Sequence, residues 1–296
     1  MVTFALRLGL WICAAALLLG LLGRVHGVFD AFAVGRLWLG VALVPLILIG
    51  LTRRLWASTA LGGVALALIA PSLWPYLSAP TPSPPSRPWI TGYQHNILFD
   101  NSRQDEIYAQ ILARDPDFVA LQEVSGLSAG LRDRLRTRYP HVLHCHLNYG
   151  WAAVLLTRLA PTGAQGCHDS GRVSYMQVET PGGPALTLVS LHLGWPWPND
   201  QRGFVRDLQP LLGQIPRPMV VAGDFNQQPW SVTVQTLAQA TGTTPVPGGR
   251  WTFWLGGVLP LQIDNVLAEP GLGAHVQKLG RYGSDHNAQW ITLARP

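Results

Sequence analysis

Two short motifs near the C-terminus contain the residue types that a metal-dependent phosphoryl site needs. Gly223-Asp224-Phe225-Asn226 follows an apolar run, and Ser284-Asp285-His286-Asn287 stands close to the end of the chain. Carboxylate and amide oxygens bind hard divalent cations, and a neighbouring histidine can bind a phosphate oxygen or move a proton. Together these residues indicate attack of an oriented water on a phosphate ester.

Polar residues also close several apolar runs that are typical of buried strands. Asn96, Glu123, His192 and Asp224 each end such a run, and Asp264 lies near the start of another. A packed sheet brings side chains at its strand ends to one rim while the strands themselves stay buried. Glu123 is informative on its own, because a carboxylate that closes an apolar strand is costly unless it is paired or metal-bound.

The elements that would position these residues can be predicted from short β-branched or apolar runs separated by Gly, Pro and Asn turns. We predict strands over 90–96, 118–123, 152–157, 173–179, 185–193, 219–224, 263–268 and 289–293. We predict helices over 102–114, 128–139, 200–214 and 231–241.

The ordered set of positions resembles the endonuclease/exonuclease/phosphatase superfamily. That superfamily includes exonuclease III type repair nucleases, DNase I, inositol polyphosphate 5-phosphatases and neutral sphingomyelinases. A single Gly-Asp-Phe-Asn or Ser-Asp-His motif is common, so it is the order of the whole set that carries the resemblance. The resemblance covers about residues 89–296. It implies a four-layered α/β sandwich, in which two mixed β-sheets are flanked by helices.

The resemblance also implies a metal site and an enzyme that hydrolyses phosphoric esters. Glu123 resembles the principal Mg²⁺ ligand, and Asn96 beside it resembles a ligand or a partner of that ligand. Asp285 resembles an additional metal-side carboxylate. Mn²⁺ or Ca²⁺ are alternatives to Mg²⁺.

The remaining positions resemble catalytic residues. Asp224 matches the carboxylate that orients or deprotonates the attacking water, and Asn226 matches the amide that fixes a phosphate oxygen and the nucleophile. By the same resemblance His286 is hydrogen-bonded to Asp264, and His192 binds a nonbridging oxygen of the scissile phosphate. The sequence leaves open whether Asp224 or His286 takes the proton, and whether one metal or two act.

Structural alternatives exist for single positions. Asn96 could cap the segment after its strand, Asp224 with Asn226 could form an Asx turn, and Asp264 could be a solvated strand end. A lone histidine such as His192 is more often a satisfied core residue than a ligand.

Histidines and cysteines elsewhere suggest a zinc site, but their spacing fits no ordinary zinc motif. The residues concerned are His144, Cys145, His146, Cys167 and His168. Two cysteines in this region could equally form one disulfide or remain as buried thiols.

The first 77 residues are predicted to be a membrane anchor of three helices, at about 4–22, 37–51 and 55–77, because a spanning helix needs roughly 20 apolar residues. The second stretch is short unless it borrows residues 31–35, with Arg36 reaching toward lipid headgroups. A cleavable signal peptide is the alternative for the first stretch. A slight excess of arginines at the start and in the second loop places the remainder outside the cytoplasm.

A proline-rich segment, residues 78–88, is predicted to be an extended linker that holds a domain of residues 89–296 a short distance off the membrane. Five arginines and Asp30 precede residue 87, which leaves 16 basic against 15 acidic residues in the rest of the chain. That domain therefore lacks the basic excess of a general nucleic-acid binder.

Tryptophans lie on predicted loops near the proposed site. Trp195 and Trp197 follow His192, and Trp251 and Trp254 precede the strand of Asp264. Aromatic residues on loops beside a bilayer suit its interfacial zone. Together with the anchor, they favour a membrane lipid or lipid carrier as the phosphate substrate, and Trp195 and Trp197 as substrate-side residues.

Two alternative functions remain open at this stage. One is a membrane-tethered extracytoplasmic nuclease, which would use a basic groove formed by Arg132, Arg134, Arg136 and Arg138, although these residues are also typical of a solvated helix face. The other is an inactive domain that binds phosphorylated ligands or a partner protein. The sequence does not determine the oligomeric state.

Overall fold

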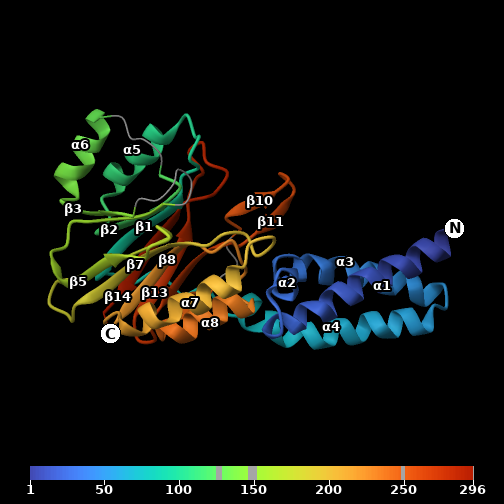
Figure 1. Ribbon diagram of the computed structural model, residues 1–296. Coiled ribbons are helices and arrows are strands. Elements are labelled where there is room, and N and C mark those ends of the chain that lie inside the picture. Colours follow the sequence, from blue (N-terminus) through green and yellow to red (C-terminus); the bar gives the residue numbers. More distant parts are fainter. Residues whose placement is uncertain (125–128, 146–151, 248–250, 296) are drawn as a thin grey trace.

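The computed structural model describes residues 1–124, 129–145, 152–247 and 251–295. An elongated bundle of N-terminal helices is joined to a larger α/β domain that contains both large sheets and the C-terminus (Figure 1). The first residue lies at the end of the bundle that is farthest from this domain (Figure 1).

Three apolar helices form the bundle: α1 (Val2–Gly20), α3 (Phe32–Thr52) and α4 (Trp56–Leu77). Each of them is long and apolar enough to cross a membrane. The segment between α1 and α3 contains a short 3₁₀ helix, η1 (Leu21–Arg24), and a single turn, α2 (Gly27–Asp30). The second long helix, α3, begins at Phe32. It therefore extends the apolar stretch 37–51 by residues 32–36 and reaches a spanning length.

Arg36 does not reach toward headgroups as we expected. Its side chain is buried between the helices, donating to the backbone carbonyl of Gly20 at 2.8 Å and to the Ser72 hydroxyl at 3.2 Å. The last carbonyls of a helix have no partner within the helix, and Arg36 supplies one to the end of α1. A contact between helices therefore takes the place of a contact with the membrane surface.

Two six-stranded mixed sheets make up the α/β domain. The first has the order β13-β14-β1-β2-β4-β3 and the second the order β5-β6-β7-β8-β12-β9. The pairs β1–β2 and β7–β8 are parallel and the other pairs are antiparallel. The first sheet contains β1 (Ile90–Asn96), β2 (Phe118–Gln122), β3 (His141–His144), β4 (Ala153–Thr157), β13 (Gly273–Lys278) and β14 (Gln289–Ala294). The second contains β5 (Pro161–Cys167), β6 (Val173–Val178), β7 (Leu186–His192), β8 (Met219–Asp224), β9 (Thr244–Pro245) and β12 (Asp264–Ala268).

The sheets pack face to face, and helices cover their outer faces (Figure 1). The core between them is built from alternating apolar residues such as Ile90, Leu155, Leu188 and Val266. Helices α5 (Gln104–Arg114) and α6 (Ala129–Arg138) cover the first sheet, whereas α7 (Gln201–Gln214) and α8 (Val232–Thr241) cover the second. The four-layered α/β sandwich predicted from the sequence is confirmed.

The predicted strands and helices of this domain that lie within the described residues all form, with ends within two residues of the prediction. The prediction missed β3, β5, β9 and β13, and the small hairpin of β10 (Phe253–Leu255) and β11 (Leu259–Leu261). These are edge strands or very short ones. β5 contains Gly163 and Gly166 and is largely solvent-accessible, so it has no apolar alternation to detect.

The α/β domain packs directly against the helical bundle. Trp230 lies buried among the apolar residues of the bundle, and its indole N–H donates to the carbonyl of Ala33 at 2.8 Å. The indole N–H of Trp38 in α3 donates to the carbonyl of Pro260 at 2.8 Å. The segment 78–88 contains neither helix nor strand, as expected of an extended linker. Direct contacts, in addition to this segment, join the domain to the bundle.

Candidate active site

The register of the strands brings the candidate residues to one edge of the two sheets. In the second sheet, Asp224 stands opposite His192 in the parallel pair β7–β8 and opposite Asp264 in the antiparallel pair β8–β12. In the first sheet, Asn96 stands opposite Gln122, the residue before Glu123. Because the sheets face each other, the ends of these strands converge.

Asn96 links the two sheets through its side-chain amide. The amide nitrogen donates to Glu123 Oε1 at 2.9 Å and to Asp224 Oδ2 at 3.0 Å. Its carbonyl oxygen accepts from the backbone N–H of Leu98 at 3.1 Å. In this arrangement Asn96 is a partner that orients two carboxylates, which is one of the two roles expected for it.

Glu123 points into the site because the chain turns sharply after β2. Its φ of 58° lies in the left-handed region, which is unfavourable for a residue with a side chain. The carboxylate is held by Asn96 and by the backbone N–H of Phe99, which donates to Oε2 at 3.3 Å. Such backbone strain occurs preferentially at functional sites, where surrounding contacts maintain it.

Asp224 and Asn226 form a compact turn at the end of β8. The backbone N–H of Asn226 donates to Asp224 Oδ1 at 2.8 Å, and its side-chain amide donates to Asp224 Oδ2 at 3.2 Å and to the carbonyl of Leu193 at 2.8 Å. This is the geometry of the Asx turn considered above. Here it orients a fully buried carboxylate toward the other candidate residues.

His286 and Asp264 form a buried dyad. Nδ1 of His286 lies 2.8 Å from Asp264 Oδ2, which leaves Nε2 facing Asp224 Oδ2 at 3.8 Å. Burial alone would lower the pKa of His286, but the carboxylates of Asp264 and Asp224 outweigh it and raise the pKa to about 10. Burial would likewise raise the pKa of Asp264, but the charge and hydrogen bond of His286 outweigh it and lower that pKa.

His192 completes the cluster from the end of β7. Its Nε2 lies 3.8 Å from Glu123 Oε1 and 3.8 Å from Asp224 Oδ2. Two histidines thus face Asp224 from different segments, because His192 ends β7 and His286 lies before β14. The arrangement can hold a phosphate oxygen and a water against a fixed carboxylate.

The acidic residues of the site fit a divalent cation. Two overlapping groups each offer ligand atoms that lie within 4.8 Å of one another. The first group is Glu123, His192 and Asp224, and the second is Asp224, Asp264 and His286. Burial raises the pKa of Glu123. Burial also raises the pKa of Asp224, to about 8, although the charge of His286 acts in the opposite direction. In the described part of the chain neither of these two carboxylates has an Arg or Lys within ion-pair distance. A bound cation would supply the missing charge.

A buried amide network between the sheets supports the dyad, and sequence reasoning missed it. The Gln94 side-chain amide donates to Asp264 Oδ1 at 3.1 Å and to Gln122 Oε1 at 2.8 Å. The Gln122 amide in turn donates to the Ser190 hydroxyl at 2.9 Å. A detectable signal existed, because these three polar residues interrupt apolar strands at positions that face the opposite sheet.

Comparison with protein families and solved structures agrees with this geometry. Residues 93–286 match the Endonuclease/Exonuclease/phosphatase family. The chain belongs to this family. Members of the family are phosphoric ester hydrolases that use divalent metal ions, and the chain is an enzyme of that class. A search of curated protein sequences gave no match.

Several solved structures share the fold of this chain. An endonuclease/exonuclease/phosphatase protein from Beutenbergia cavernae matches with a TM-score of 0.54 at 20% identity, over 71% of this chain and 72% of that one. TDP2 of D. rerio, complexed with a single-strand DNA product, matches with a TM-score of 0.55 at 18% identity, over 69% of this chain and 98% of that one. SmcL matches with a TM-score of 0.52 at 14% identity, over 69% and 99%.

Three of the candidate residues lie at the margin of this endonuclease/exonuclease/phosphatase site. The Asp285 side chain is 49% exposed, and its Oδ1 lies 4.0 Å from His286 Nε2. Trp195 is half-buried, with its ring 5.9 Å from that of Phe253, whose own ring lies 4.9 Å from His286. Trp197 is 63% exposed. Asp285 is therefore outside the tight cluster, and in the described part of the chain Trp195, but not Trp197, is linked to His286 through ring contacts with Phe253.

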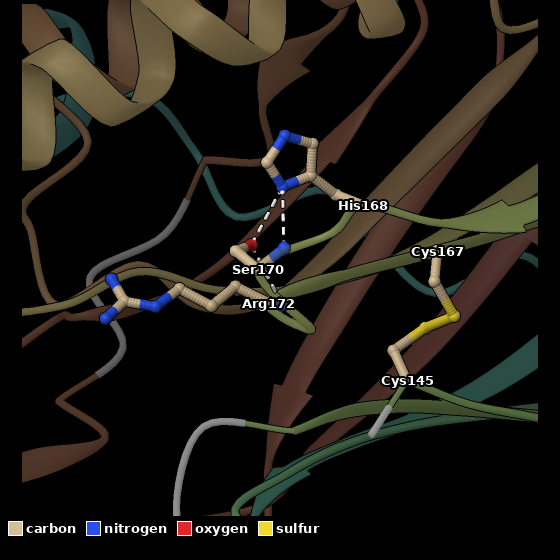
Figure 2. Close-up of a disulfide and its surroundings, with 5 residues drawn as sticks. All are labelled: Cys145, Cys167, His168, Ser170 and Arg172. Carbon is tan, nitrogen blue, oxygen red and sulfur yellow. Dashed lines mark hydrogen bonds between the residues drawn. A yellow bond between two sulfur atoms is a disulfide. The ribbon is translucent and has the colours of Figure 1, made fainter. Parts of the chain in front are cut away.

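The cysteines considered for a zinc site form a disulfide. Cys145, directly after β3, is bonded to Cys167 at the end of β5, so the bond joins the edge strands of the two sheets (Figure 2). His168 is engaged locally, with Nδ1 2.8 Å from the Ser170 hydroxyl. His146 lies outside the described residues. Because the two sulfurs are bonded to each other, they provide no thiolates for zinc.

Proposed function

We propose that this protein is a membrane-anchored, Mg²⁺-dependent phosphoesterase that hydrolyses a phosphate ester of a membrane lipid or lipid carrier. The observation that carries the proposal is the position of the site. The loop that follows Asp224 contacts the helical bundle: Gln227 bonds to Asp30 in α2, and Trp230 bonds to Ala33 in α3. The catalytic residues therefore lie a few residues from the segment that would meet the lipid headgroups.

Exposed apolar side chains on the same side of the domain support a lipid substrate. The tip of the β10–β11 hairpin exposes Leu255 (45%) and Val258 (82%), and the body of the hairpin is bonded to Trp38 of α3. Lys278 and Arg281 lie over the ring of Trp254 in the same hairpin. An apolar tip with flanking cations suits the boundary between acyl chains and anionic headgroups.

Glu123 and Asp224, oriented by Asn96, would hold the metal ion, and their carboxylate oxygens suit Mg²⁺, with Mn²⁺ or Ca²⁺ as alternatives. Bound there, the ion would polarise the phosphoryl oxygen and neutralise developing negative charge. Asp224, fixed by three amide hydrogen bonds, orients the attacking water and accepts its proton. His192 and His286 donate hydrogen bonds to the nonbridging oxygens of the phosphate.

We further propose that the three helices span the membrane and that the catalytic domain lies outside the cytoplasm. The N-terminus and the turn between α3 and α4 lie at the end of the bundle away from the domain (Figure 1). In the sequence, Arg53 and Arg54 fall between α3 and α4, and Arg7 falls in the first two turns of α1. Basic residues favour the cytoplasmic side. The Cys145–Cys167 disulfide is typical of an oxidising compartment.

The proposal is tested by release assays on the full-length protein in nanodiscs with Mg²⁺. The panel contains a phospholipid, a sphingolipid, a polyprenyl phosphate and single- and double-stranded DNA, with Asp224→Ala as the inactive control. We expect the protein with Mg²⁺ to release the phosphate-linked product from at least one lipid. EDTA should abolish this release. Rapid cleavage of DNA without release from any lipid would refute the lipid assignment and support the nuclease alternative.

The α6 helix gives the nuclease alternative little support. Arg134 and Arg136 are exposed, and Arg138 forms an ion pair with Asp115 on the neighbouring segment. The side chain of Arg132 lies outside the described part of the chain. In the described residues, α6 therefore offers a solvated face with one of its arginines neutralised.

A further inference from the structure

The segment between the first two apolar helices contains a buried carboxylate that bonds to the catalytic domain. Asp30 is 1% exposed. Its Oδ1 accepts from the backbone N–H of Val232 at 2.8 Å, and its Oδ2 accepts from the backbone N–H and the hydroxyl of Thr233 at 2.9 and 2.7 Å. Figure 1 shows this segment beside the start of α8. The first N–H groups of a helix have no partner inside it, so Asp30 caps α8 from a position about 200 residues earlier in the chain.

The helix that Asp30 caps is the one that follows the catalytic turn. Only residues 225–231, which we term the catalytic loop, separate Asp224 from α8. Asn226 in this loop has a φ of 48°, in the left-handed region that asparagine adopts more readily than most residues. It is held by its own bonds to Asp224 and Leu193 on one side and by the rest of the loop on the other.

The helical bundle holds the catalytic loop at two points. The Gln227 side-chain amide donates to the carbonyl of Asp30 at 3.2 Å. Trp230 is 6% exposed, packs among residues of the bundle and donates to the carbonyl of Ala33 at 2.8 Å. From the second sheet, the Asn265 amide donates to the backbone carbonyl of the same Gln227 at 2.9 Å. The loop is thus held by the sheet on one side and by the bundle on the other.

We infer that the membrane-anchoring segment is a structural part of the active site, in which Asp30 positions the catalytic loop and, through it, Asn226 and Asp224. Asp30 is a positioning residue, because it touches neither the reacting atoms nor the cluster around Glu123. The inference goes beyond the proposed function, since it applies whichever phosphate ester is the substrate.

The first test uses Asp30→Asn in the full-length protein, in detergent, with bis(p-nitrophenyl) phosphate and Mg²⁺. Asparagine keeps the size of the side chain but replaces one acceptor oxygen with an NH₂ donor. The variant therefore cannot accept all the hydrogen bonds that Val232 and Thr233 donate to Asp30. We expect kcat to fall about tenfold, as for partners that orient ligand residues, with KM unchanged within about twofold.

Arg202→Gln is the matched control. The Arg202 guanidinium donates to the carbonyl of Gly23 at 2.9 Å, so it also joins the catalytic domain to the α1–α3 segment, but from α7 rather than from the catalytic loop. We expect its kcat to stay at the wild-type level. Equal losses in both variants would overturn the inference, because they would show a general effect of weakening the interface.

A double-mutant cycle separates positioning from simple destabilisation. If Asp30 acts through the catalytic loop, Asp30→Asn combined with Asn226→Ala should be no slower than Asn226→Ala alone. Multiplicative losses would overturn the inference.

Hydrogen exchange gives a readout that does not depend on turnover. The catalytic loop and the amides of Val232 and Thr233 should exchange faster in Asp30→Asn but not in Arg202→Gln, and unchanged exchange in Asp30→Asn would refute the inference. Should Asp30→Asn not fold, Trp230→Phe removes the bond to Ala33 while keeping an aromatic ring, and the same predictions apply to it.

Discussion

Replacing Asp264 with asparagine tests the chemical role of the buried dyad. Asp264 is 0% exposed, and its carboxylate accepts from His286 Nδ1 at 2.8 Å and from the Gln94 amide at 3.1 Å. Asp264→Asn preserves shape but removes the charge that raises the pKa of His286, and it permits the wrong imidazole tautomer. A histidine that donates or moves a proton contributes about 10²- to 10⁴-fold to the rate, and we expect kcat to fall within this range, about 2.7–5.5 kcal/mol of transition-state stabilisation.

The assay is Mg²⁺-dependent phosphodiester hydrolysis from pH 5 to 9, with folding checked by thermal melting. Asp117→Asn is the matched control, because the Asp117 carboxylate also accepts several hydrogen bonds, from Thr91 and Arg158, but precedes β2 at the end opposite Glu123. The control should lower stability and leave kcat unchanged. A folded Asp264→Asn protein that keeps kcat within about threefold of wild type at every pH would refute the catalytic role of the dyad.

Three further predictions follow from the site and its surroundings. Saturating Mg²⁺ at 100 times its Kd should stabilise the wild type by about 2.7 kcal/mol in thermal melts, and Glu123→Ala should lose both this stabilisation and activity. Replacing Cys145 and Cys167 together by serine should lower the free energy of unfolding by about 3 kcal/mol in denaturant titrations, since the bond closes a loop with a sequence separation of 22. The double substitution Leu255→Asp and Val258→Asp should reduce activity on lipid vesicles at least about tenfold while leaving turnover of a water-soluble diester unchanged, and equal losses on both substrates would contradict a role in membrane contact.

The layers of the fold could be predicted because most of its central strands are largely apolar and end in polar residues. Apolar runs such as Met219–Asp224 are buried on both faces, so nearly every residue along them is apolar. Edge strands obey no such rule. β13 alternates weakly, with Ala274 and Val276 turned inward between exposed or half-buried residues, and nothing in its sequence distinguishes it from a polar loop.

Convergence of the site could be anticipated from residue types, but the individual bonds could not. Strand ends meet at a rim whatever the details of pairing, which is why Asn96, Glu123 and Asp224 come together. The partner of a buried polar group depends on which strand faces it across the core, and Gln94 finds Asp264 170 residues away. The partner of Asp30 could not be predicted for the same reason. In the sequence Asp30 is a single charge in an apolar region, and in the fold it is hydrogen-bonded to Thr233, 203 residues later.

The direction in which the site faces follows from the topology. β7 and β8 are parallel and β12 is antiparallel to them, so the ends of β7 and β8 and the start of β12 lie at one edge. The segments that leave that edge after β8 and precede β12 are bonded to the bundle, through Trp230 and through the carbonyl of Pro260. The domain therefore cannot turn its site away from the bundle without exposing Trp230 and leaving Asp30 buried without its partners, a change that costs several kcal/mol. The proposed substrate, a phosphate ester carried by the bilayer, would therefore approach this edge beside the apolar helices.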